Sequence, residues 1–399
     1  MRIMRFSLFA LLGCLASVSV AQANVTGVTN NEIKIGSVFP FSGPASAFGN
    51  VGKGLIAYVR MLNDQGGING RQINLIAYDD GYQPPKAVEQ TRKLVEGDEV
   101  AMIFGQMGTP GNSATVKYLN AKKVPHLFIS SGAAKFANFN DFPFTTTGLL
   151  SYAVEGRIYA KYVGKNFPNA KVAILYQNDD LGKDFLGAFK EGVSSGLAEK
   201  ITALSYEVAE PTIDSQVVNL KTSGADVFLI AGSPKFTAQA IRKAYEINWR
   251  PQIMLNFVSS SIAATMVPAG VEKAIGAISG ALLKDMVDER WANDQGILEY
   301  RAFFAKYLSG ADILDGNYMY GVTQGMILEQ LLKQCGSDLS RENLLKQARS
   351  IQPQQFPLAI PGIKVNTSAN NSMAWTQLQL RRWNGKGWEP FGEIFSALD

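Results

Sequence analysis

The chain has 399 residues, of which 46% are hydrophobic and 18% charged, and its formal net charge is +4. This balance excludes a disordered, collagenous or coiled-coil chain, and so small a charge gives no support to a nucleic-acid partner. With one histidine and two cysteines, a zinc site, an iron–sulfur cluster and a histidine-based dyad are all disfavoured, so we expect no metal and no cofactor. The length predicts two lobes, because single cores stop growing at roughly 300 residues.

The N-terminus has the parts of an export signal. Residues 1–5 are basic, residues 6–20 are almost continuously apolar or small, and Ala21-Gln22-Ala23 matches a signal-peptidase site. We therefore expect residues 1–23 to be a signal peptide cleaved after Ala23, and the protein to be periplasmic. One alternative is a membrane anchor, for which the apolar stretch is shorter than the roughly 20 residues needed. The other is a lipoprotein acylated at Cys14, which ends a lipobox-like sequence.

Strands and helices are predicted to alternate along the first part of the mature chain. Short apolar runs predict strands at 33–39, 73–78, 100–104 and 125–129. Helical spacing of apolar residues at 51–62, and prolines at 84–85 and 110, predict the helices between them. This alternation predicts βαβ units whose right-handed crossovers form a doubly wound parallel sheet.

The same alternation begins again after the three threonines 145–147. Helices are predicted around 154–162, 185–193 and 240–245, and strands at 172–176, 201–208, 227–231 and from 253. Longer helices are expected around 298–308 and 318–332, and Asn384-Gly385 predicts the turn of a β-hairpin in the tail. The sequence therefore predicts an α/β protein with two similar doubly wound, Rossmann-like halves.

Several short motifs follow one another in a specific order. They are Phe41-Ser42-Gly43-Pro44, the turn at 66–70, Tyr78-Asp79-Asp80, the segment 105–109 and Asp179-Asp180-Leu181-Gly182. In this order they resemble a type I periplasmic solute-binding protein of ABC importers, in the leucine-binding-protein-like group for branched-chain amino acids. The resemblance covers nearly the whole mature chain. It implies two lobes joined by three crossing hinge strands, with the ligand in the cleft between the lobes.

The resemblance also implies where the lobes begin and end. It places the three crossings near 145–148, 255–257 and 360–363. The N-terminal lobe would then contain residues 24–146 and 257–359, and the C-terminal lobe residues 147–256 and 360–399.

Loops that follow predicted strands carry the candidate site, since ligands of open α/β sheets bind beyond the carboxyl ends of the strands. Thr109-Pro110 has the residue types of a helix cap and first position, which would leave the next amides free for a carboxylate. An ordinary cap is the alternative, and the resemblance favours the ligand site. Small residues at 131–133 would let a ligand approach the backbone. The full set expected to bind the ligand is Phe48, Thr109, Ser131, Gly132, Ala133, Leu181 and Phe257.

Some positions depart from the pattern of the amino-acid binders that the chain resembles. Ala134 stands where a threonine is usual, and Phe257 lies where an acidic residue would pair with the ligand's ammonium. A buried ammonium without an anion is costly, so this loss should weaken recognition of an α-amino group unless Asp179, Asp180 or Glu207 substitutes. An aromatic or aliphatic carboxylate without an α-amino group fits such a cleft at least as well as leucine does.

These inferences together predict a protein that binds a small molecule and catalyses nothing. We expect a monomeric substrate-binding component that captures a small hydrophobic or branched-chain amino-acid-like solute by hinge closure and delivers it to ABC permease subunits. An exported ligand sensor on the same fold is an alternative. An enzyme on a Rossmann-like fold is disfavoured, because the dinucleotide fingerprint is missing and His126 is the single histidine.

Overall fold

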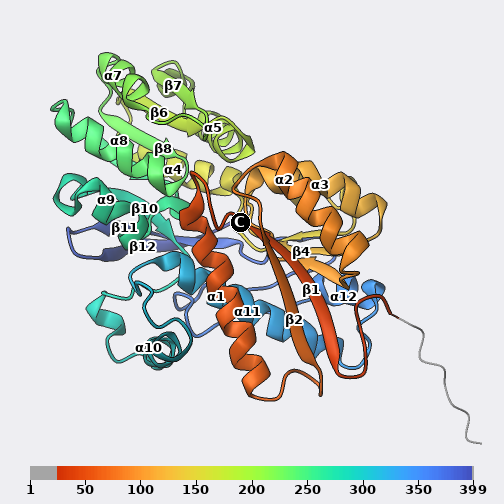
Figure 1. The fold of residues 1–399 in the computed structure, drawn as a ribbon. Coiled ribbons are helices and arrows are strands. Elements are labelled where there is room, and N and C mark those ends of the chain that lie inside the picture. Colours follow the sequence, from red (N-terminus) through yellow and green to blue (C-terminus); the bar gives the residue numbers. More distant parts are fainter. Residues whose placement is uncertain (1–24, 398–399) are drawn as a thin grey trace, which may run out of the picture.

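Two β-sheets organise residues 25–397, the part of the chain that the computed structural model describes (Figure 1). The predicted signal peptide and Cys14 lie outside the described residues. The first sheet has the order β2-β1-β3-β4-β5, with strands β1 (Glu32–Phe39), β2 (Gln72–Asp79), β3 (Met102–Phe104), β4 (His126–Ile129) and β5 (Thr145–Thr147). All of its strands are parallel.

The second sheet repeats the same topology and adds a hairpin at one edge. Its order is β12-β11-β10-β9-β8-β6-β7. The parallel strands are β6 (Val172–Gln177), β7 (Ile201–Tyr206), β8 (Val227–Ala231), β9 (Gln252–Leu255) and β10 (Ile278–Ala281). The predicted hairpin is formed by the antiparallel strands β11 (Gln377–Trp383) and β12 (Trp388–Ser396).

Helices cover both faces of the first sheet. Met102 and Phe104 of β3 belong to one buried cluster and Ile103 to another, because successive strand residues point to opposite faces. The helices of this first lobe are α1 (Gly49–Asp64), α2 (Pro84–Arg92), α3 (Thr109–Ala121), α10 (Gln295–Tyr307), α11 (Gly316–Cys335) and α12 (Arg341–Ala348). The second lobe, built on the second sheet, has α4 (Tyr152–Asn166), α5 (Asp180–Gly192), α6 (Ser195–Ala198), α7 (Asp214–Thr222), α8 (Pro234–Glu246) and α9 (Val267–Ala269).

The expected position of the second crossing is wrong. The chain does not leave the second sheet at 255–257, because β10 follows and pairs in parallel with β9. It passes to the first lobe only after residue 281, where Leu283 bridges Ala359. Residues 257–281 therefore lie with the second lobe. This strand is not predicted from the sequence, because β10 has only four residues and two of them, Ser279 and Gly280, are not residues that favour strands.

The expected third crossing, near 360–363, also lies too early in the chain. The Ser372 carbonyl accepts a hydrogen bond from the Thr147 amide, and Met373 bridges Thr147 at the edge of the first sheet. The chain then enters the second sheet in β11. Residues 360–372 consequently remain with the first lobe.

Glycines let α1 and α11 lie very close together. A Cβ atom at Gly321 would come within 2.1 Å of the Val51 carbonyl oxygen, and one at Gly54 within 2.4 Å of the Tyr318 carbonyl oxygen. The two helices carry side chains that line the site described below. Their close contact therefore fixes one wall of that site.

We expect Gly321→Ala to destabilise the protein by about 1–3 kcal/mol or more, because the added methyl group has to displace backbone. Gly316→Ala is the matched control, since a Cβ there meets nothing within 4 Å at the start of the same helix. Urea unfolding of both variants measures the difference. Equal unfolding free energies would show that α1 and α11 are not packed as described.

Candidate functional site

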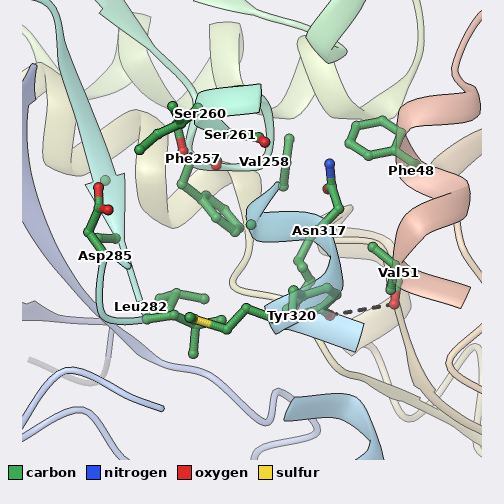
Figure 2. Close-up of a pocket in the computed structure, with 18 of the residues that line it drawn as sticks. Phe48, Val51, Phe257, Val258, Ser260, Ser261, Leu282, Asp285, Asn317 and Tyr320 are labelled. Carbon is green, nitrogen blue, oxygen red and sulfur yellow. Dashed lines mark hydrogen bonds between the residues drawn. The ribbon is translucent and has the colours of Figure 1, made fainter. Parts of the chain in front are cut away.

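A cavity of about 140 Å³ lies between the two lobes, and both lobes supply its walls (Figure 2). The first lobe contributes Phe48 and Val51 at the start of α1 and Asn317 and Tyr320 of α11. The second lobe and the crossing segment contribute further residues, which are Leu181, Phe257, Val258, Ser260, Ser261, Ile262 and residues 280–286. Most of these side chains are apolar. The cavity therefore favours a solute with an apolar body.

The topology explains why these residues meet. In the first sheet the strand order reverses between β1 and β3, and in the second sheet between β6 and β8. Such reversals open a crevice beyond the carboxyl ends of the strands. Phe48 follows β1, Thr109 follows β3, Leu181 follows β6 and Phe257 follows β9, and all four line the cavity.

Thr109 lines the cavity but does not cap its helix as predicted. The N-cap of α3 is Gly108, whose φ of 102° suits glycine, and Thr109 is the first helical residue. The Thr109 hydroxyl instead lies 2.8 Å from the Ser131 hydroxyl and 3.4 Å from the Tyr152 hydroxyl. All three side chains are buried. Thr109 and Ser131, which the sequence analysis expects to bind the same ligand, are therefore in contact.

Ser131, Gly132 and Ala133 do not line the cavity, whereas Ser130 does. The Gly132 carbonyl accepts a hydrogen bond from the Tyr152 amide, and a Cβ at Gly132 would lie 2.2 Å from the Leu150 carbonyl oxygen. The observed contacts of this segment thus hold Thr109 and Tyr152 in place. Its contact with a ligand stays a prediction.

The N-terminus of α3 already faces an acidic side chain. A Cβ at Gly111 would lie 3.2 Å from Oδ2 of Asp80, and Oδ1 of Asp80 accepts a hydrogen bond from the Tyr82 amide. Burial raises the pKa of Asp80 to about 6, so this carboxyl group is largely ionised at neutral pH. A ligand carboxylate placed here would meet a like charge.

The three carboxylates proposed as ammonium partners do not line the cavity. Asp179 caps α5 by accepting a hydrogen bond from the Leu181 amide, and Asp180 lies 2.6 Å from Nζ of Lys135. Glu207 accepts a hydrogen bond from Asn178 at the exposed surface. These carboxylates are therefore occupied elsewhere.

The charged residues that do line the cavity were missed by the sequence analysis. They are Lys284, Asp285 and Arg381. Lys284 pairs with Asp294 at 2.7 Å, whereas Asp285 and Arg381 have no ion-pair partner within 4.0 Å among the described residues. No local motif marks any of the three, because they come from the crossing segment and the hairpin.

Polar contacts join the lobes around the cavity. Gln177 donates a hydrogen bond to the Tyr82 hydroxyl at 3.3 Å, and the Ser261 hydroxyl donates to Asp315 at 2.8 Å. At the surface, the Ala134 amide donates to Asp184 at 2.7 Å. Each of these hydrogen bonds joins a residue of the first lobe to a residue of the second. The two lobes are therefore in contact in this structure.

Glu155 of α4 holds the backbone next to Phe257. Its Oε1 atom accepts a hydrogen bond from the Phe257 amide at 2.7 Å, and the side chain is fully buried. Burial raises the pKa of Glu155 to about 8. The folded protein therefore retains a proton on this group at neutral pH.

The raised pKa of Glu155 predicts a stability that depends on pH. A folded-state pKa near 8, against an ordinary value of 4.5, means that stability is lost as the pH rises from about 5 to about 8. Glu155→Gln should remove this part of the loss, which is on the order of 5 kcal/mol at most.

Urea unfolding at pH 5.5 and pH 8.5 tests this expectation. Burial also raises the pKa values of Asp80 and Asp179 to about 6, so both residues lower the stability as the pH rises toward 6. They do so equally in the wild type and in Glu155→Gln. The difference between the variant and the wild type isolates Glu155. An identical pH dependence of the two unfolding free energies would contradict the assignment.

Residues 25–397 contain neither a membrane-spanning helix nor a cluster of metal-binding side chains. No helix there is both long and apolar enough to cross a membrane. No group of three or more His, Cys, Asp or Glu side chains in the same residues is arranged to hold a metal ion.

Comparison with known proteins identifies the family. Residues 32–387 match the model of a family described as periplasmic binding protein, and the chain belongs to that family. The chain is 28% identical to the Leu/Ile/Val-binding protein homolog 3 of Brucella melitensis, over 57% of this chain and 61% of that protein. The aligned region thus spans about three fifths of that relative's length.

Solved structures share the whole architecture at low sequence identity. A fatty acid ABC transporter substrate-binding protein from Thermomonospora curvata superposes with a TM-score of 0.79 and 20% identity, covering 93% of this chain and 94% of that one. A solute binding protein of an ABC transporter from Rhodopseudomonas palustris, in complex with 3,4-dihydroxybenzoic acid, gives 0.76 and 17%, covering 92% and 98%. These likenesses show the fold, with two α/β lobes as the sequence predicted.

Proposed function

We propose that the protein is the periplasmic substrate-binding component of an ABC importer and that its solute is a small, largely apolar organic acid. The observation that carries this proposal is the cavity between the lobes, which both lobes line and which is mostly apolar. A solute in this cavity would touch both lobes at once. It would therefore stabilise the arrangement in which the lobes meet over an open one.

The family and the printed names of similar proteins support this proposal. The chain belongs to the periplasmic binding proteins. Its structural neighbours include proteins named for fatty acids and found with a dihydroxybenzoic acid, and its relatives include a Leu/Ile/Val-binding homologue. The protein of this proposal binds its solute without changing it and acts as a monomer. It delivers the solute to permease subunits in the membrane.

Individual side chains have distinct roles in the proposed site. Phe48, Leu181 and Phe257 form apolar walls from both lobes, and Thr109 offers a hydroxyl to a polar group of the solute. The Thr109 hydroxyl is held by Ser131 and Tyr152, so little side-chain entropy is lost when it binds.

A branched-chain amino acid is the second candidate solute, and Asp285 is the observation that favours it. This carboxylate lines the cavity and is half-buried, although it lies away from the position expected for an ammonium partner. It could pair with an α-ammonium group. An exported sensor remains the alternative role, and co-purification with permease subunits would distinguish importer from sensor.

A panel of solutes tests the proposal on protein that has been unfolded, freed of bound ligand and refolded. We expect benzoate, 4-hydroxybenzoate, 4-methylpentanoate or hexanoate to raise the unfolding temperature, since a solute at one hundred times its Kd adds about 2.7 kcal/mol. Leucine, isoleucine and valine form the second arm. A shift with the amino acids alone would favour the second candidate, and no shift with any member would contradict both.

Replacing Thr109 by valine removes its hydroxyl while keeping its volume. We expect Thr109→Val to weaken binding of 4-hydroxybenzoate about two- to tenfold, the effect of one lost hydrogen bond to a neutral polar group of the solute. Thr115→Val is the control in the same helix, because the Thr115 hydroxyl bonds to the Gly111 carbonyl and does not line the cavity. Calorimetric titration measures both. Equal Kd values for the wild type and Thr109→Val would remove Thr109 from the site.

A further inference from the structure

One end of the cavity contains a cation with most of its hydrogen-bond donors unused. Arg381 lies on β11 opposite Ser279 of β10, and its side chain lines the cavity. Its Nη2 atom donates a hydrogen bond to the Ser260 hydroxyl at 2.6 Å. Its Nε atom is buried and has no hydrogen-bond partner among the described residues. A guanidinium group has five N–H donors, so this contact leaves most of them free.

The charge of Arg381 is also not neutralised by an ion pair. Asp285 is a nearby carboxylate, but Oδ1 accepts a hydrogen bond from the Val287 amide and Oδ2 one from the Trp388 amide. Burial lowers the pKa of Arg381, and the charge of Asp285 opposes this shift. Guanidinium groups stay charged in proteins, and Arg381 is half-buried with a buried Nε atom that has no hydrogen-bond partner among the described residues. Its free donors are therefore suited to an anionic group of a solute.

The surroundings of Arg381 hold it in a fixed orientation. The guanidinium carbon lies 4.8 Å from the centre of the Trp388 ring, and the Trp388 indole N–H donates to the Ser260 carbonyl. The Ser260 hydroxyl in turn donates to the Phe257 carbonyl at 2.6 Å. Arg381, Ser260 and Trp388 thus form a rigid polar end that adjoins the apolar wall at Phe257, as Figure 2 shows for Ser260.

We propose that Arg381, held in place by Ser260, binds the carboxylate of the solute, while its apolar body extends along Phe257, Val258 and Leu282. This inference rests on the proposed function and names the class of solute as an apolar monocarboxylate. It moves the carboxylate away from the start of α3, where Asp80 would repel it. Thr109, in the other lobe, then contacts a second polar group of the solute, such as the hydroxyl of 4-hydroxybenzoate.

The test compares acids with their uncharged amides on the full chain. Calorimetric titrations use benzoate with benzamide and 4-methylpentanoate with 4-methylpentanamide. We expect the wild type to bind the acids more tightly than the amides. Arg381→Gln should weaken binding of the acids at least tenfold and leave binding of the amides nearly unchanged.

Arg382→Gln is the matched control. Arg382 is the next residue of β11, is exposed, and places its guanidinium over Phe391 instead of in the cavity. We expect this variant to bind like the wild type. A loss equal to that of Arg381→Gln would overturn the inference, because the effect would then come from net charge.

Arg381→Lys keeps the test valid if Arg381→Gln does not fold. The lysine retains a positive charge but cannot form the bidentate contact, so we expect weaker binding of the acids with a preserved preference over the amides. Equal weakening of acids and amides would mean that Arg381 only shapes the cavity, and would overturn the inference.

The remaining outcomes separate this inference from the proposed function. If the wild type prefers the acids and Arg381→Gln prefers them equally, the inference is overturned and the proposed function stands. If the wild type binds no member of the set, both are overturned.

Discussion

The cavity has walls from both lobes, and this constraint governs how the protein can work. Phe48 of the first lobe and Leu181 of the second both line it. Neither lobe alone encloses the space, so a solute loses its contact with water only when the lobes meet around it. Burial of the solute and contact between the lobes are therefore one event.

Several polar contacts between the lobes are individually weak. Lys135 and Asp180 are both more than one third exposed, and exposed ion pairs contribute little, about 0–1 kcal/mol. The hydrogen bonds from Gln177 to Tyr82 and from Ser261 to Asp315 replace contacts with water, and each has a small net value. Under the proposed function, a solute that contacts both walls adds to these contacts and favours the arrangement in which the lobes meet.

Much of the fold and part of the site could be predicted from the sequence. The alternation of apolar runs located the parallel strands up to β9 except β5, which consists of three threonines. The positions that follow strands pointed to Phe48 and Thr109, and the family resemblance pointed to Leu181 and Phe257; all four line one cavity. Strand β10 escaped because it is short and contains Ser279-Gly280. Arg381 and Asp285 escaped because their place in the site depends on the pairing of β11 with β10, which links residues about one hundred positions apart and leaves no local pattern.

The central claim is that bound solute holds the two lobes together. Small-angle scattering of ligand-free protein, with and without a saturating amount of the acid that binds most tightly, tests it most directly. We expect a smaller radius of gyration with the solute, because lobes that close around it make the molecule more compact. Radii that are identical within error, for a solute shown to bind under the same conditions, would contradict the account.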